Sequence, residues 1–250
     1  MRKIAVITGA GSGIGAATAE YFSSQSWLVI LLGRNLDRLK TVQSKLRHPG
    51  WCIELDLMQS DSIQAAAQQI LKIYSQEETF LSLINNAGIY ENKKFMQTDA
   101  QHWQSQFQTN LFGPVELTRT ILPEMIKAKR GTIVNVSSTL GLRSIVNTSA
   151  YSATKSAMNS WTQTLALELG EYQIRVNAVC PGIIDTPIHP FHSLPNEEKK
   201  AVFESMAAMQ PLGRVGDPMD VAKSIFYLAS ELSTWSTGTL IPVDGGINLT

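Results

Sequence analysis

The chain has 250 residues, of which 44% are hydrophobic and 17% are charged, so its length favours a single domain with a sizeable core. Basic and acidic residues both total 21, and the resulting net charge of zero argues against a general nucleic-acid binder or a basic membrane-surface protein. Cys52 and Cys180 lie far apart and without metal-ligand spacing, which predicts free thiols in a reducing cytoplasm and no bound metal. No apolar run approaches the length of a membrane span, and the first one stops at Thr8-Gly9 without signal-peptide features.

Short apolar runs alternate with longer helical patterns along the chain. The runs expected to form strands are 4–7, 28–32, 52–55, 80–84, 132–136, 175–179 and 240–243. The expected helices lie near 14–25, 35–47, 61–74, 99–128, 152–169 and 218–230. Continuous apolar runs are typical of a parallel sheet that is covered on both faces. The alternation therefore predicts an α/β fold over 1–250, with a doubly wound, parallel, seven-stranded sheet and helices on both faces.

The first expected strand runs directly into a glycine-rich turn, Thr8-Gly9-Ala10-Gly11-Ser12-Gly13-Ile14-Gly15, which opens a helix. Glycines let the backbone approach a pyrophosphate, and the free N–H groups at the start of a helix bind its charge. In this context we predict a Rossmann-like dinucleotide site rather than an ordinary tight turn. The residues expected to line it are Gly9, Gly11, Ser12, Gly13, Ile14 and Gly15.

The second strand ends in Gly33-Arg34 and has no acidic residue at its tip. In dinucleotide sites an acid at this position binds the ribose 2′-hydroxyl, whereas an arginine suits a 2′-phosphate. Arg34, with Asn35 beside it, therefore predicts NADP(H). NAD(H) is the alternative, because Asp37 is near enough in sequence to reach the ribose.

Three residues predict proton-transfer chemistry. Tyr151 and Lys155 stand four apart, which places them on one face of a helix, and Ser138 precedes Tyr151 by thirteen residues. Lowering a tyrosine pKa from about 10 to ~7 requires roughly 4 kcal/mol of preference for the phenolate, and a neighbouring ammonium supplies much of it. A serine hydroxyl nearby would hold a carbonyl oxygen during protonation. The alternative is a solvated helix face with a half-buried ring.

Residues 187–212 interrupt the alternation. They carry four prolines together with His189, His192 and several apolar side chains. We expect an insertion with a short helix, which forms a lid over the substrate, because long excursions in compact domains are often binding loops. A subunit-contact helix or a surface loop is the alternative.

Together these motifs resemble the short-chain dehydrogenase/reductase family along nearly the whole chain. The resemblance implies that Asn110, Ser138, Tyr151 and Lys155 are catalytic, and that Lys155 also binds the nicotinamide ribose. It implies that Asp56 and Leu57 hold the adenine. It further implies that the nicotinamide side is lined by Asn86, Ala87 and Gly88 of Asn85-Asn86-Ala87-Gly88, and by Pro181, Gly182, Ile184 and Thr186. Gly238 and the stretch 243–246 resemble the family's C-terminal ending, whereas Ser82 departs from an acid that the family often carries.

Each of these motifs also has a structural interpretation. Asp56 would cap the following helix, and Asn85–Gly88 would be an ordinary turn. Asn110 would bond locally within its helix, and Pro181-Gly182 would only interrupt the chain.

The resemblance implies an NAD(P)(H)-dependent oxidoreductase that interconverts a carbonyl and a secondary alcohol by hydride transfer, with NADPH preferred. It also implies a cytoplasmic homotetramer whose subunits meet along the helix that carries Tyr151. A 3-oxoacyl thioester is the default substrate, because its reduction is the commonest activity among bacterial-looking relatives. The segment 187–212 is the family's variable substrate segment, so the resemblance identifies no substrate from it. The alternatives are a sugar, a steroid-like or a xenobiotic alcohol, an epimerase or dehalogenase reaction, and a non-catalytic dinucleotide-binding sensor.

Overall fold

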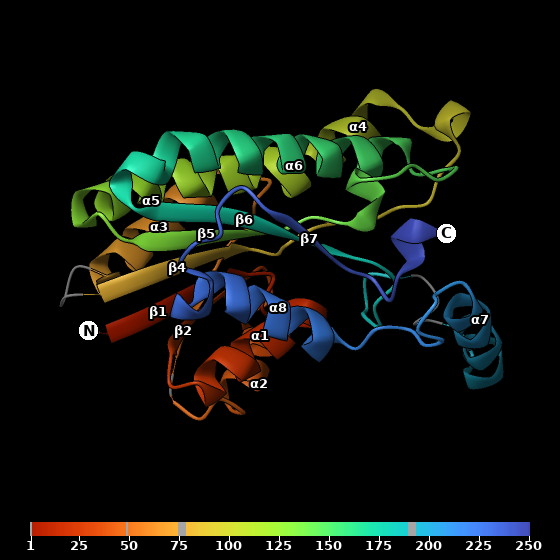
Figure 1. Cartoon of the computed structure of the whole chain (residues 1–250), viewed down its shortest axis with the longest axis horizontal. Coiled ribbons are helices and arrows are strands. Elements are labelled where there is room, and N and C mark those ends of the chain that lie inside the picture. Colours follow the sequence, from red (N-terminus) through yellow and green to blue (C-terminus); the bar gives the residue numbers. More distant parts are fainter. Residues whose placement is uncertain (1, 49, 75–78, 190–193) are drawn as a thin grey trace.

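The computed structural model describes residues 2–48, 50–74, 79–189 and 194–250. Its strands form one parallel, seven-stranded sheet in the order β3-β2-β1-β4-β5-β6-β7 (Figure 1). The strands are β1 (Arg2–Thr8), β2 (Leu28–Gly33), β3 (Trp51–Glu54), β4 (Thr79–Asn85), β5 (Gly131–Val136), β6 (Ile174–Pro181) and β7 (Leu240–Val243).

Helices cover both faces of this sheet. They are α1 (Gly13–Ser24), α2 (Leu36–Gln43), α3 (Ser60–Tyr74), α4 (Ala100–Phe107), α5 (Gly113–Ala128), α6 (Ser149–Leu169), α7 (Asn196–Ala208) and α8 (Pro218–Ala229). Figure 1 shows α3 to α6 on one face and α1, α2 and α8 on the other. The predicted doubly wound α/β fold is therefore confirmed.

The alternation of side chains along the central strand explains the two layers. Ile4 and Val6 belong to the core that includes residues of α3, α5 and α6, whereas Ala5 and Ile7 belong to the core that includes residues of α1 and α8. Successive side chains of a strand point to opposite faces, so a strand that is apolar throughout supplies both cores.

The prediction of one continuous helix over 99–128 is wrong in one respect. The structure divides it into α4, a π-helical turn over Gln108–Phe112, and α5. A π turn inserts one residue into the helical repeat, and such turns occur frequently at functional sites. This one contains Asn110, whose side chain bonds outside the helix.

The chain connections bring distant segments to the carboxyl ends of the strands. β1 pairs with β2 on one side and β4 on the other, so the strand order reverses between β1 and β4. Ligands of such sheets bind at this switch point, beyond the carboxyl ends of the strands. The glycine-rich turn follows β1, Asn86 follows β4, Ser138 lies just after β5, and Gly182 follows β6.

The segment 187–212 contains the short helix that was expected, α7. Figure 1 shows α7 beyond the main body of the sheet, at the same end of the molecule as the C-terminus. Residues 190–193, including His192, lie outside the described residues. Within the part of the chain that is described, no helix has the length and apolarity needed to cross a bilayer.

Candidate active site

The glycine-rich turn is tightly enclosed by the neighbouring loops. Gly9 and Gly13 adopt φ angles of 65° and 52°, in the left-handed region that favours glycine. A Cβ atom added to Gly9 would lie 2.9 Å from the Cα of Ala87, and one added to Gly13 would lie 3.1 Å from the Cγ2 of Thr186. The turn therefore requires glycine both for its conformation and for its contacts with the segments after β4 and β6.

Asn86 fastens the Asn-Asn turn to the glycine-rich turn. Its Nδ2 donates a 2.8 Å hydrogen bond to the carbonyl of Thr8, and the N–H groups of Asn86 and Ala87 both donate to the Thr8 Oγ1 at 2.9 Å. Asn85–Gly88 is thus more than an ordinary turn. Thr8 was not predicted as a site residue, and only its position at the end of a strand before the first glycine marks it.

The start of α1 suits an anion. Ser12 precedes the helix in an extended conformation, makes no side-chain cap hydrogen bond, and is exposed. The first turn of α1 contains no acidic residue. Since the first N–H groups of a helix lack partners within it, they are available to a pyrophosphate. These residues fit a dinucleotide.

Two arginines lie in the segment after β1 and its glycine-rich turn: Arg34 directly follows β2, and Arg38 is in the first turn of α2. Arg34 is exposed, as its predicted role requires, whereas the Asn35 side chain accepts a 3.0 Å hydrogen bond from the N–H of Arg38 and caps α2. Asn35 is therefore committed to the helix. The Cβ of Arg38 lies 3.2 Å from the position that a Cβ on Gly11 would take. Arg38 was not predicted; its spacing of four from Arg34 at the start of a helix is the signal that would have identified it.

Asp56 does not cap α3, which begins at Ser60, but closes the turn before it. Its Oδ1 accepts a 2.9 Å hydrogen bond from the N–H of Met58, and its own N–H donates to the Oγ of Ser62. Leu57 is buried, and its carbonyl accepts a 3.1 Å hydrogen bond from the Nε2 of Gln108. Contact of Asp56 and Leu57 with an adenine stays a prediction.

Ser138, Tyr151 and Lys155 are all buried, with exposed fractions of 8%, 9% and 3%. Tyr151 and Lys155 lie in the first turns of α6, and the Lys155 Nζ is 5.7 Å from the centre of the Tyr151 ring. The Nζ donates a 2.8 Å hydrogen bond to the carbonyl of Val136 at the end of β5. The alternative of a solvated helix face is wrong.

Burial shifts the two titrating groups in opposite directions. It raises the pKa of Tyr151 to about 12, which the neighbouring Ser138 hydroxyl opposes and Tyr90 reinforces. It also lowers the pKa of Lys155 to about 8. The expectation that Lys155 draws the phenol pKa toward ~7 is therefore not met, because desolvation of the buried phenol dominates. A phenol that is protonated at neutral pH is the state that a proton donor needs.

Asn110 links the π-helical turn between α4 and α5 to the loop after β4. Its Oδ1 accepts a 2.8 Å hydrogen bond from the N–H of Ile89, and its Nδ2 lies 3.0 Å from the Ile89 carbonyl. The same Nδ2 lies 3.1 Å from the Oε1 of Gln106 and 3.2 Å from the Oγ1 of Thr154 on α6. A purely local role within the helix is therefore wrong for Asn110.

The segment after β6 is also fixed by contacts. The Pro181 carbonyl accepts a 3.3 Å hydrogen bond from Thr139, and a Cβ on Gly182 would lie 2.8 Å from the Cα of Asp244. Ile184 is buried and pairs with Gly216 in an isolated bridge. Together with the contact between Thr186 and Gly13, these interactions place the segment beside the glycine-rich turn, so it does more than interrupt the chain.

Comparison with known proteins decides the family. The model of the short chain dehydrogenase family matches residues 3–195. The chain belongs to this family. It is 35% identical to the 3-oxoacyl-acyl-carrier-protein reductase FabG of Aquifex aeolicus over 98% of this chain and 97% of the relative.

Other members of the short-chain dehydrogenase family act on different compounds. The chain is 34% identical to cis-4-hydroxycyclohexanecarboxylate dehydrogenase of Sinomonas cyclohexanicum, over 98% of this chain and 96% of the relative. Among solved structures, ElxO with NADP bound superposes with a TM-score of 0.89 at 28% identity, covering 100% of both chains. The predicted family, fold and oxidoreductase class are confirmed.

We predict that carbonyl reduction falls as the pH rises through about 8, where Lys155 loses its charge. Tyr151 stays protonated over this range, because its pKa is about 12. The measurement is kcat/KM for a ketone against pH at saturating NADPH. Arginine stays protonated over this whole pH range, so the residual activity of Lys155→Arg should show no such decrease. A native profile that is flat from about pH 7 to about pH 10 would contradict the assignment.

Proposed function

We propose that this short-chain dehydrogenase is an NADPH-dependent reductase that converts a ketone into a secondary alcohol, with a 3-oxoacyl thioester as its substrate class. The observation that carries the proposal is the burial of Ser138, Tyr151 and Lys155, with Lys155 beside Gly88 of the turn that packs against the glycine-rich turn. The free thiols of Cys52 and Cys180 support a location in the reducing cytoplasm.

The roles of the residues follow from the charge that develops during reduction. When bound, NADPH would supply a hydride to the carbonyl carbon, and negative charge would then develop on the carbonyl oxygen. Ser138 holds this oxygen by a hydrogen bond, and Tyr151 donates a proton to it. Lys155 stabilises the resulting phenolate and binds the ribose hydroxyls. The alcohol is oxidised by the same groups in reverse.

Two further assignments belong to this proposal. Asn110 positions a water that passes protons to Lys155, and its place in the π turn, against both α6 and the loop after β4, supports a role at the site. The segment 187–212 covers the substrate. This role is supported by the position of Thr186, which directly precedes the segment and packs close to Gly13 of the glycine-rich turn.

The choice of substrate class rests on the relatives. The 35% identical FabG reduces 3-oxoacyl groups by its name, and the match covers nearly the whole of both chains. A cyclic secondary alcohol is the second candidate, because the cyclohexanecarboxylate relative is almost equally similar. A non-catalytic sensor is disfavoured, since pure dinucleotide binding does not require Ser138 and Tyr151 to be buried beside Lys155.

Replacing Tyr151 with Phe tests the reaction. The change removes the donated proton and keeps the ring, so NADPH-dependent ketone reduction should fall by a factor of about 10² or more. NADPH affinity, measured by tryptophan fluorescence, should change by less than about threefold. Turnover of an acetoacetyl thioester is followed by NADPH absorbance. Near-native turnover in this variant would remove Tyr151 from the mechanism.

Preference for NADPH over NADH is supported by two arginines, one at the end of β2 and one in the first turn of α2. Arg34 is exposed at the tip of β2, and Arg38 lies next to Gly11. An arginine binds a 2′-phosphate through two charge-assisted hydrogen bonds, whereas the uncharged 2′-hydroxyl of NADH forms only a weaker hydrogen bond with it. Asp37, the competing residue, lies between them in sequence.

We predict that Arg34→Ala lowers the ratio of kcat/KM for NADPH over NADH by roughly tenfold to a hundredfold, chiefly through a higher KM for NADPH. Arg34→Lys should retain part of the preference, because it keeps the charge without the planar fork. Arg47→Ala, which removes a charge from the bend after α2, is the matched control. An NADH preference in the native chain that survives Arg34→Ala would overturn the NADPH assignment.

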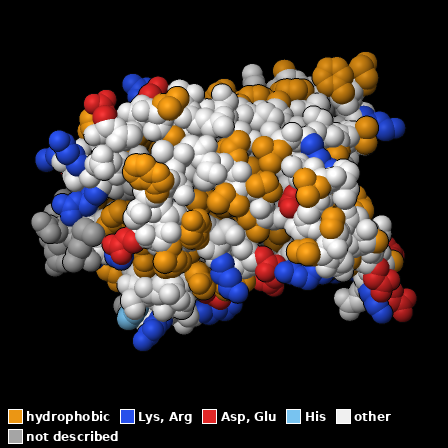
Figure 2. Space-filling view, viewed as in Figure 1, with side chains coloured by type: hydrophobic (Ala, Val, Ile, Leu, Met, Phe, Trp, Pro, Cys, Tyr) orange, Lys and Arg blue, Asp and Glu red, His pale blue; other side chains and the backbone are white. Residues whose placement is uncertain are grey.

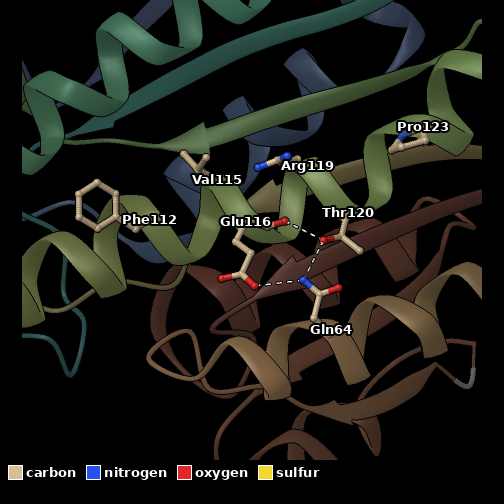
Figure 3. Close-up of a pocket in the computed structure, with 7 residues that line it drawn as sticks. All are labelled: Gln64, Phe112, Val115, Glu116, Arg119, Thr120 and Pro123. Atoms are coloured by element: carbon tan, nitrogen blue, oxygen red, sulfur yellow. Dashed lines mark hydrogen bonds between the residues drawn. The ribbon is translucent and has the colours of Figure 1, made fainter.

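A homotetramer is the proposed assembly. The outer faces of α5 and α6 support it: Leu167 on α6 is 85% exposed, and Phe112 before α5 is 52% exposed. A hollow of about 580 Å³ lies along the outer side of α5, lined by Phe112, Val115, Arg119 and Pro123 together with Gln64 of α3 (Figure 3). Figure 2 shows that the face over β7 and α8 also carries hydrophobic side chains across its middle.

Light scattering should therefore give about four times the 27.5 kDa of one chain. Leu167→Glu places a charge on the exposed face of α6 and should lower this mass. The same change at Met96, which is 89% exposed in the short 3₁₀ helix before α4, is the control. A native mass of a single chain would contradict the proposed tetramer.

A further inference from the structure

Tyr90 packs directly against the proposed proton donor. Its ring lies edge-on to Tyr151, with centres 5.0 Å apart and planes at 83°. On its other side it meets His189, at 5.9 Å and 65°, so Tyr90 is the middle of three rings. His189 belongs to the segment 187–212, and Tyr90 therefore lies between this segment and Tyr151.

The backbone on both sides of Tyr90 is held in place. The two backbone groups of Ile89 bond to the amide of Asn110. The carboxylate of Glu91 lies 3.0 Å from the Nδ1 of His102, whose side chain is only 6% exposed. The Tyr90 hydroxyl also accepts a 3.4 Å hydrogen bond from Asn92. These contacts anchor the loop that carries Tyr90, and the Tyr151 and His189 rings pack on either side of its ring, which forms a wall beside Tyr151.

The position of this wall limits what the proposed reaction accepts. A carbonyl oxygen that receives the Tyr151 proton lies within about 3 Å of the phenol oxygen, so a group on the carbonyl carbon lies beside the Tyr151 ring. Tyr90 already packs against that ring. A flexible methylene chain passes such a wall, whereas a bulky or branched group collides with it.

We propose that Tyr90 is a specificity-determining residue, which restricts the reaction to ketones with narrow, unbranched groups on the carbonyl carbon. This inference rests on the proposed ketone reduction and adds a substrate class to it. A 3-oxoacyl group, whose ketone is flanked by methylenes, satisfies the restriction.

Two β-keto esters provide the probe: ethyl acetoacetate, which carries a methyl group on the ketone, and ethyl benzoylacetate, which carries a phenyl ring there. The measurement is the ratio of their kcat/KM values with NADPH. Tyr90→Ala should raise the ratio of benzoylacetate to acetoacetate by roughly tenfold or more, because the deleted ring leaves space for the phenyl group. Tyr90→Phe, which keeps the ring, should leave the ratio within about threefold of native.

Tyr21→Ala is the matched control. Tyr21 is also half-buried and also packs edge-on against an aromatic ring, that of Phe226, at 5.3 Å and 89°. The change removes an equivalent ring contact between α1 and α8, away from Tyr151, and should leave the ratio unchanged. Tyr90→Leu is a milder truncation that serves if the alanine variant folds poorly. The ratio is independent of the amount of active protein in each sample, since both substrates are measured on the same preparation.

The outcomes separate the two proposals. A native chain that reduces neither ester, nor an acetoacetyl thioester, overturns the proposed function and this inference with it. A native chain that reduces them, and whose ratio in both Tyr90→Ala and Tyr90→Leu stays within about threefold of native, overturns the role of Tyr90 alone. An equal rise of the ratio in Tyr21→Ala also overturns it, because the effect would then reflect a general loosening of the fold.

Discussion

The burial of Lys155 is the constraint on which the site depends. An ammonium removed from water is unfavourable unless it is paired or hydrogen-bonded, and here its donor is held by the Val136 carbonyl at the end of β5. The residual cost appears as a pKa lowered to about 8. The same desolvation raises the pKa of Tyr151 to about 12. One physical cause thus keeps the phenol protonated while leaving the lysine close to titration.

The carboxyl edge of the sheet supplies the rest of the arrangement. Thr8 at the end of β1 binds the turn after β4, and Gly13 contacts Thr186 after β6. Asn110, in the π turn, holds both Ile89 and Thr154. Side chains that are far apart in sequence therefore hold one another in position. The short loop that carries Tyr90 is held by Asn110 through Ile89.

Several parts of this arrangement were predictable because they have local sequence signals. The apolar runs predicted the strands, and the glycine-rich turn predicted the dinucleotide fit because left-handed φ angles require glycine at Gly9 and Gly13. The helix over 99–128 was predicted without its interruption, since a π turn changes the repeat by one residue and leaves the apolar pattern on both sides intact. Thr8 and Arg38 were missed although each has a weak local signal, whereas Tyr90 has none, because its place depends on Tyr151 and His189, which are distant in sequence.

The amino-acid sequence by itself determined the fold class, the family and the identities of the residues in the reactive trio, because strand and helix periodicity, glycine positions and the i, i+4 spacing of Tyr151 and Lys155 are local properties. The tertiary structure alone decided how those residues titrate, since desolvation depends on everything packed around them. It also decided that Asn35 caps a helix while Arg38 approaches Gly11, and that Tyr90 stands against Tyr151. Those contacts exist only once β1, β4, β5 and β6 bring their carboxyl ends together.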